Sequence, residues 1–133
     1  MILDTSVVIA ILKDEPESAV YAEAIEKTSL RRISAVTLFE MGADADRNEN
    51  PALSLAIDEF VALIHPIVEP VTEVQAKIAR QAYREFGRGS GSPAQLNSGD
   101  CFAYALAKDR DEPLLYKGSD FVHTDVRFAI GER

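Results

Sequence analysis

The sequence has 133 residues, which suits one domain spanning 1–133, and its 47% hydrophobic and 27% charged residues are ordinary for a globular protein. It contains no apolar run of the ~20 residues that a membrane span needs and no evident secretory signal, and its single cysteine cannot form an internal disulfide; we therefore expect a cytoplasmic protein without membrane contact. The net charge of −8 excludes a module that holds nucleic acid by bulk positive charge, although it is compatible with an enzyme whose acids bind metal ions.

Short apolar segments alternate with longer amphipathic ones along the chain. The alternation predicts strands at 1–4, 32–34, 65–68 and 113–116, with a last short strand near 126–128. It predicts helices at 5–12, 16–27, 35–47, 50–64, 72–86 and 99–108. Strands that alternate with helices are typical of an α/β fold with a mainly parallel sheet.

Two helices have a predicted buried face. The helix at 35–47 is expected to bury Val36, Phe39 and Ala43. Thr72-Glu-Val-Gln75 has the form of a capping box at the start of the helix at 72–86. That helix is expected to bury the apolar residues spaced four apart along it, Val74, Ile78, Ala82 and Phe86. The stretch from Gly87 to Gly99, rich in Gly, Ser and Pro, is predicted to be a loop within the domain.

Four acids stand where the predicted sheet would form a site. Asp4 ends the first strand, Asp100 starts an apolar helix, Asp120 follows the strand at 113–116, and Glu40 lies in the helix after 32–34. Taken one at a time, each has an ordinary explanation: Asp4, Asp100 and Asp120 as helix caps, and Glu40 as a solvated surface residue. Sites in parallel sheets form at the carboxyl ends of strands, so the combination is stronger evidence than any member.

Close carboxylates repel one another and need compensating positive charge. Divalent cations provide it, and Mg²⁺ or Mn²⁺ prefers oxygen ligands. We therefore expect a metal site built from Asp4, Glu40, Asp100 and Asp120. Thr5, Ser6 and Lys117 lie beside these acids and are candidates for positioning water or phosphate.

Four segments carry a family resemblance: Met1–Ser6, Ser34–Glu40, Leu96–Ala107 and Leu114–Asp125. They resemble, in order and spacing, a PIN-domain ribonuclease, specifically a VapC-type toxin of a toxin–antitoxin pair. The resemblance implies a three-layer α/β/α fold, Mg²⁺-dependent endoribonuclease activity, a homodimer and a cognate antitoxin. It matches Asp4, Glu40 and Asp100 to the principal acids and Asp120 to the more variable fourth, where Ser119 replaces a frequent Asn.

The mechanism expected from the resemblance is hydrolysis of an RNA phosphodiester by a metal-activated water, leaving 5′-phosphate and 3′-hydroxyl ends. Two other readings stay open. The first is a metal-dependent phosphatase with an aspartyl nucleophile, which would usually need a second Asp where Ser6 stands. The second is a non-catalytic receiver-like domain, in which an Asp would be expected after the third strand, where this chain has Glu69. Cys101, within an apolar helix, is expected in the core rather than in catalysis.

Overall fold

The structure is a computed structural model and describes residues 1–130. Four parallel strands form the sheet in the order β3-β2-β1-β4, with β1 (Ile2–Leu3) next to the centre, flanked by β2 (Arg32–Ser34) and β4 (Leu114–Leu115). The two edge strands are β4 and β3 (Ile67–Glu69), and β3 pairs with β2. Both residues of β1 and both residues of β4 are buried, and every pairing in the sheet is parallel. The predicted parallel sheet is therefore confirmed.

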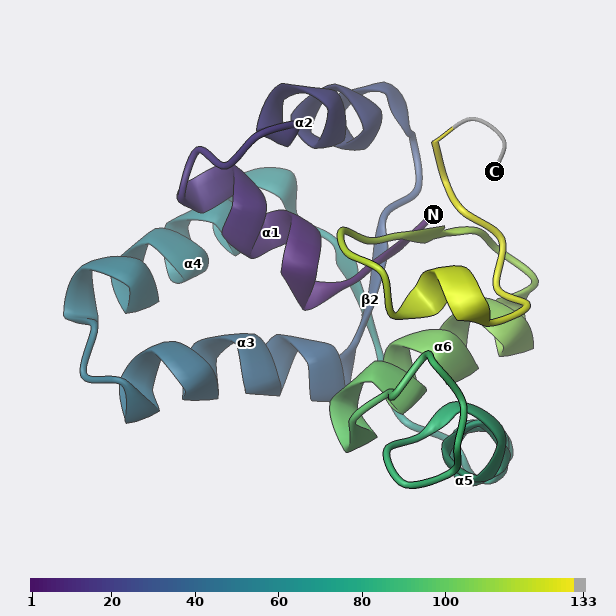
Figure 1. The fold of residues 1–133 in the computed structure, drawn as a ribbon. Coiled ribbons are helices and arrows are strands. Elements are labelled where there is room, and N and C mark those ends of the chain that lie inside the picture. The colour runs from purple at the N-terminus through teal and green to yellow at the C-terminus, as the bar shows by residue number, and fades with distance from the viewer. Residues whose placement is uncertain (131–133) are drawn as a thin grey trace.

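Six helices cover the two faces of the sheet (Figure 1). They are α1 (Thr5–Leu12), α2 (Ser18–Lys27), α3 (Ala35–Arg47), α4 (Pro51–Ile64), α5 (Glu73–Phe86) and α6 (Ser98–Arg110). A 3-10 turn at Phe121–His123 follows β4. The helix starts agree with the caps expected from the sequence, since side chains of Asn50 and Thr72 accept from the backbone of their first turns. Gln75 Nε2 donates to Asp109, but its Oε1 accepts no hydrogen bond from any residue of 1–130, so the second bond of the predicted capping box at Thr72 is not formed.

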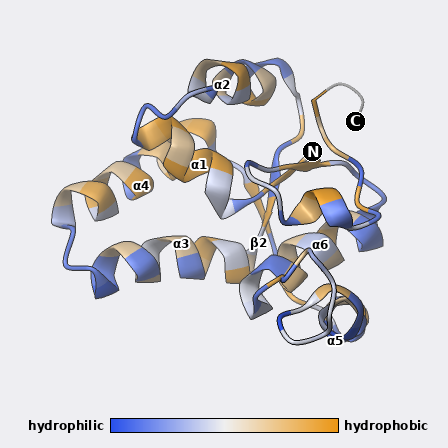
Figure 2. Cartoon of the chain, viewed as in Figure 1, coloured by the Kyte–Doolittle hydropathy of each residue, from blue (hydrophilic) through white to orange (hydrophobic). Residues whose placement is uncertain are grey.

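The two residues of β1 point to opposite faces of the sheet and pack in different hydrophobic cores, and so do the two residues of β4. Ile2 and Leu114 pack with α5 and α6, whereas Leu3 and Leu115 pack with α1, α2, α3 and α4. Figure 2 shows α1 hydrophobic along most of its length, as expected for a helix whose residues Val7, Val8 and Ala10 are buried. The result is a three-layer α/β/α arrangement, which confirms the predicted fold class. Within the described part of the chain, no helix has the length and hydropathy to cross a bilayer.

Three details of the sequence prediction were wrong. The buried face of α3 consists of Thr37, Met41 and Ala45, shifted from the predicted residues by one or two positions, and Phe39 is 70% exposed. Val74 is exposed at the start of α5, where Gln75 and Ala79 point inward instead. The predicted strand at 126–128 is reduced to one parallel bridge between Leu114 and Phe128.

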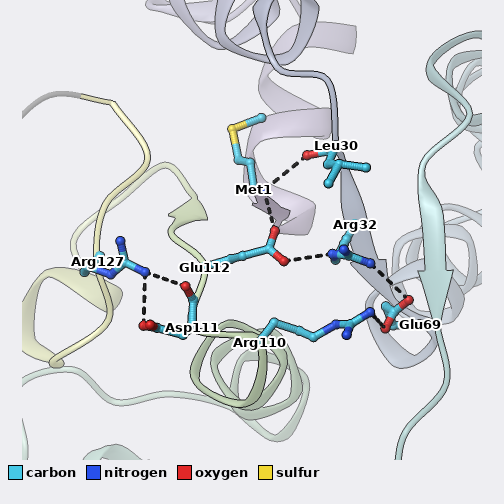
Figure 3. Close-up of polar contacts among 8 residues, drawn as sticks. All are labelled: Met1, Leu30, Arg32, Glu69, Arg110, Asp111, Glu112 and Arg127. Atoms are coloured by element: carbon cyan, nitrogen blue, oxygen red, sulfur yellow. Dashed lines mark hydrogen bonds and ion pairs between the residues drawn. The ribbon is translucent and has the colours of Figure 1, made fainter.

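Ion pairs tie the strands together at their amino ends (Figure 3). Glu112 accepts from the Met1 amine at 2.7 Å and from Arg32 Nε at 2.8 Å, so it joins β1, β2 and the segment before β4. Glu69 on β3 extends the network to Arg32 at 3.5 Å and to Arg110 at 2.7 Å. Burial would raise the pKa of Glu112, but the bonds from Met1 and Arg32 outweigh it, and the net shift lowers that pKa.

We expect Glu112→Gln to lower the free energy of unfolding by about 1–2 kcal/mol at pH 7, because two charge-assisted hydrogen bonds weaken. A carboxyl with a lowered folded-state pKa stabilises above its unfolded pKa, so the difference should shrink as the pH falls through the pKa of Glu112. Urea titrations at pH 7 and pH 3 measure it. Glu23→Gln, which breaks an exposed pair with Lys27, is the control and should leave stability unchanged. Equal stability of the Glu112 variant and the unmodified protein at pH 7 would show that the network is not stabilising.

Candidate active site

Asp4 lies at the carboxyl end of β1 and is 6% exposed. Its Oδ2 accepts from the Ser6 hydroxyl at 2.6 Å and from the Ser6 backbone N–H at 3.1 Å, so Asp4 also caps α1. The Ser6 hydroxyl in turn accepts from the backbone N–H of Lys117 at 2.9 Å. Both expectations for Asp4 are therefore met: the carboxylate is a helix cap and it sits at the end of a strand.

The segments after β1 and β4 are held together by this Ser6 hydroxyl. Its contacts are to Asp4 and Lys117, so Ser6 positions the carboxylate in this structure. The side chain of Lys117 extends to Glu15, at 3.4 Å, and does not line the acidic cleft described below. Thr5 does line that cleft.

A cleft of about 210 Å³ gathers acids from three elements. It is lined by Asp4, which follows β1, by Glu40 of α3 and by Asp100 of α6. The other residues that line it are Thr5, Ser6, Thr37, Asp44, Asn97 and Gly99. Three of the four predicted acids are thus brought together.

Asp100 occupies the first turn of α6 and completes a capping box. Its backbone N–H donates to Asn97 Oδ1 at 2.8 Å, and its Oδ2 accepts from the Asn97 backbone N–H at 3.0 Å. No residue of 1–130 makes a hydrogen bond to its Oδ1. Asp100 therefore has a capping role and still presents an oxygen to the cleft.

Asp120 precedes the 3-10 turn and makes no side-chain cap bond there. It does not line the cleft, but its negative charge raises the pKa of both Asp4 and Asp100. The fourth predicted acid is therefore at the margin of the site.

Burial and mutual repulsion act on the three predicted acids in the cleft. Burial raises the pKa of Asp4, against the hydrogen bonds from Ser6, and the charge of Asp120 raises it further. Burial raises the pKa of Asp100 to about 6, and the charges of Asp4, Asp120 and Glu40 add to the shift. For Glu40, burial, Asp44 and Asp4 raise the pKa while Arg47 opposes them. Such a cluster is costly when ionised and is relieved by a cation.

Gly99 allows Glu40 to approach the start of α6. A Cβ at this position would overlap both carboxylate oxygens of Glu40, so any other residue would force the side chains apart. Gly99 has no functional group and works only through the space it leaves.

The sequence analysis missed four residues that line the cleft beside the predicted acids: Thr37, Asp44, Asn97 and Gly99. Thr37 and Asp44 lie one turn before and one turn after Glu40, so helical spacing around Glu40 was the available signal. Asn97 and Gly99 were placed in the predicted loop before Asp100. Cys101 is in the core as expected, at 2% exposure, and burial together with the charge of Asp100 raises the pKa of its thiol to about 11, which disfavours a thiolate nucleophile.

The acids of this cleft offer only oxygen ligands, and oxygen ligands suit Mg²⁺ or Mn²⁺. Among residues 1–130, no three His, Cys, Asp or Glu side chains are close enough to enclose an ion by themselves. Mg²⁺ commonly binds proteins through one or two carboxylates and keeps several of its waters.

A parallel α/β/α sandwich with acids converging at the carboxyl ends of its strands defines the class of protein, and comparisons with known proteins specify it. Residues 1–127 match the PIN domain. The chain is 53% identical over 133 residues to ribonuclease VapC28 of Mycobacterium tuberculosis, covering 100% of both chains. The chain therefore belongs to the PIN-domain family, among the VapC ribonucleases. The predicted family and the predicted class of enzyme, a ribonuclease, are confirmed.

Solved structures agree on the fold. The structure of Mycobacterium tuberculosis VapC20, described as a toxin that cleaves the sarcin-ricin loop, superimposes with a TM-score of 0.67 at 17% identity, covering 95% of this chain and 98% of that one. A toxin–antitoxin complex from Klebsiella pneumoniae also gives 0.67, at 18% identity, covering 93% and 92%.

We expect Asp100→Asn to raise the free energy of unfolding at pH 8 without metal by about 1–2 kcal/mol, since one pKa unit corresponds to about 1.4 kcal/mol and solvent in the cleft screens part of the shift. The folded protein holds this proton to a higher pH than the unfolded chain does, so the group's contribution to stability falls as the pH rises from about 4 to about 6. The asparagine oxygen can still accept from Asn97.

Urea titrations at pH 4 and pH 8 test this, with Asp58→Asn, an exposed change of the same charge on α4, as control. The stabilisation should be absent at pH 4 and absent in the control. A loss of stability at pH 8 would show that the Asp100 carboxylate favours the fold instead of opposing it.

Proposed function

We propose that this protein is a Mg²⁺-dependent endoribonuclease, the toxin of a toxin–antitoxin pair, and that Asp4, Glu40 and Asp100 hold the cation. The convergence of these three acids in one cleft, at the carboxyl ends of β1 and β2 and the start of α6, carries the proposal. Asp120 lies at the margin of the site, where its negative charge raises the pKa of Asp4 and Asp100. Mn²⁺ has the same ligand preference and should replace Mg²⁺.

The chain's own residues divide the work of binding and positioning. Asp4 is fixed in place by Ser6, and Asp100 by the backbone of Asn97, so both carboxylates meet a cation with little rearrangement. Glu40 reaches the same space because Gly99 leaves room for it. When bound, the cation lowers the pKa of water and offsets the charge of the phosphodiester. Thr5, which lines the cleft, and the Lys117 ammonium, once released from Glu15, are the candidates for orienting the phosphate.

The net charge of −8 shapes how an RNA could bind. Repulsion disfavours a duplex held by its backbone, and the cation offsets the negative field only at the cleft. A flexible single strand that enters the cleft locally fits this surface better than a long helix does. We therefore propose single-stranded or loop segments as the substrate class.

Exposed apolar side chains support two protein partners. On α4, Leu63 is 81% exposed and borders an apolar cavity of about 480 Å³ between α2 and α4, which we assign to the cognate antitoxin. Phe39 on α3 and Val74 on α5 are exposed as well, and we assign them to the homodimer face. The likeness of the fold to a solved toxin–antitoxin complex supports the antitoxin as a partner.

The alternative functions have weaker support. An aspartyl phosphatase would need a free acid two residues after Asp4, and Ser6 there is bonded to Asp4 itself. A receiver-like domain would need an acceptor at the end of β3, whereas Glu69, the last residue of β3, is paired with Arg32 and Arg110.

The purified protein should cleave RNA in Mg²⁺ or Mn²⁺, stop in EDTA and recover when the metal is returned. Asp4→Asn and Asp100→Asn should each lower the cleavage rate by more than about 100-fold, the upper range for losing even an outer partner of a metal. Asp58→Asn is the control and should cleave normally. Gels of labelled messenger, transfer and ribosomal RNA follow the reaction, and ligation of the fragments reads out 5′-phosphate and 3′-hydroxyl ends.

Cleavage that is insensitive to EDTA, or that survives Asp100→Asn, would overturn the proposal. Release of inorganic phosphate from phosphomonoesters without shortening of the RNA would favour the phosphatase.

A further inference from the structure

Thr37 is a polar residue on an otherwise apolar face. Of the three buried residues of α3, Met41 and Ala45 are hydrophobic, and Thr37 stands at the end of the row nearest the acidic cleft, which it lines. Its side chain is buried, with 3% of the residue exposed. Its Oγ1 makes no hydrogen bond to any residue of 1–130.

An unpaired buried hydroxyl needs an explanation, because nearly all such groups in proteins have a partner. A threonine within a helix can bond the carbonyl four residues earlier, here that of Ile33, but the Thr37 hydroxyl does not do so. Valine has the same shape and would fill this position without leaving a polar atom unpaired. The hydroxyl therefore points to a partner in the cleft that is not part of the polypeptide.

Water that hydrates a cation is the partner that fits the surroundings. Thr37 shares the cleft with Asp4 and Glu40, and among residues 1–130 no three His, Cys, Asp or Glu side chains are arranged to hold an ion by themselves. Waters must then complete the coordination, as is usual for Mg²⁺, and each needs an acceptor. A threonine oxygen has two acceptor sites.

We propose that Thr37 is a positioning residue whose hydroxyl accepts a hydrogen bond from a water of the hydrated cation held by the acids of this cleft. The inference rests on the proposed metal-dependent function. It adds to the acids a neutral side chain that contacts a water of the cation. Thr37 touches neither the substrate nor the reacting atoms, and it acts by fixing where the water sits.

The test measures Mn²⁺ binding to metal-free protein by electron paramagnetic resonance, together with urea unfolding. Thr37→Val should weaken Mn²⁺ binding by about 10- to 100-fold, as loss of an outer partner does, while the urea midpoint of the metal-free protein rises because an unpaired hydroxyl is gone. Thr37→Ser keeps the hydroxyl and should bind within about threefold of the unmodified protein. Met41→Leu, on the same buried face, controls for packing and should leave the affinity unchanged.

Two outcomes separate this inference from the function on which it rests. If Asp4→Asn abolishes Mn²⁺ binding but Thr37→Val binds as the unmodified protein does, the role of Thr37 is wrong and the metal site stands. If Asp4→Asn binds Mn²⁺ as well as the unmodified protein, the proposed site is wrong and the inference falls with it.

Discussion

The carboxylate of Asp4 is the group around which the rest of this structure is arranged. A buried carboxylate must be hydrogen-bonded, and here the bonds come from Ser6, which begins α1. The same serine hydroxyl accepts from the backbone of Lys117, after β4, so satisfying one acid fixes two connections at the carboxyl end of the sheet. The backbone N–H of Asp4 donates to Leu115, which keeps the side chain at the strand end. Stability and the position of the acid thus depend on the same contacts.

Charge is distributed very differently at the two ends of the sheet. Near the amino ends of β1, β2 and β4, Glu112 is matched by Arg32 and the Met1 amine, and Arg32 also reaches Glu69 at the end of β3 (Figure 3). At the carboxyl ends, acids face one another without a matching cation among the residues that line the cleft. The fold therefore bears an electrostatic cost at the end where a metal ion would remove it, a common feature of functional sites.

Much of this arrangement could be predicted from the sequence, because it follows from the geometry of parallel strands. Asp4 closes an apolar run and Asp100 begins an apolar helix, so the position of each acid at the end of an element was visible in the sequence. The buried face of α3 was not, since Val36, Phe39 and Ala43 form as good a stripe as Thr37, Met41 and Ala45, and the packing of α3 against α4, α6 and α1 decides between them. Thr37 and Gly99 were missed because their roles depend on which helix ends meet.

Gly99 has no reactive group, but mutations at its codon should have a genetic consequence. The space beside its Cα is taken by the Glu40 carboxylate, and every substitution encoded by a single-base change adds at least a Cβ there. If the chain is a toxin, cells that survive its expression should include many with lesions at this codon, alongside lesions at the acids themselves. A glycine could then look like a catalytic residue in a survey of escape mutants, although its only contribution is to leave room for Glu40.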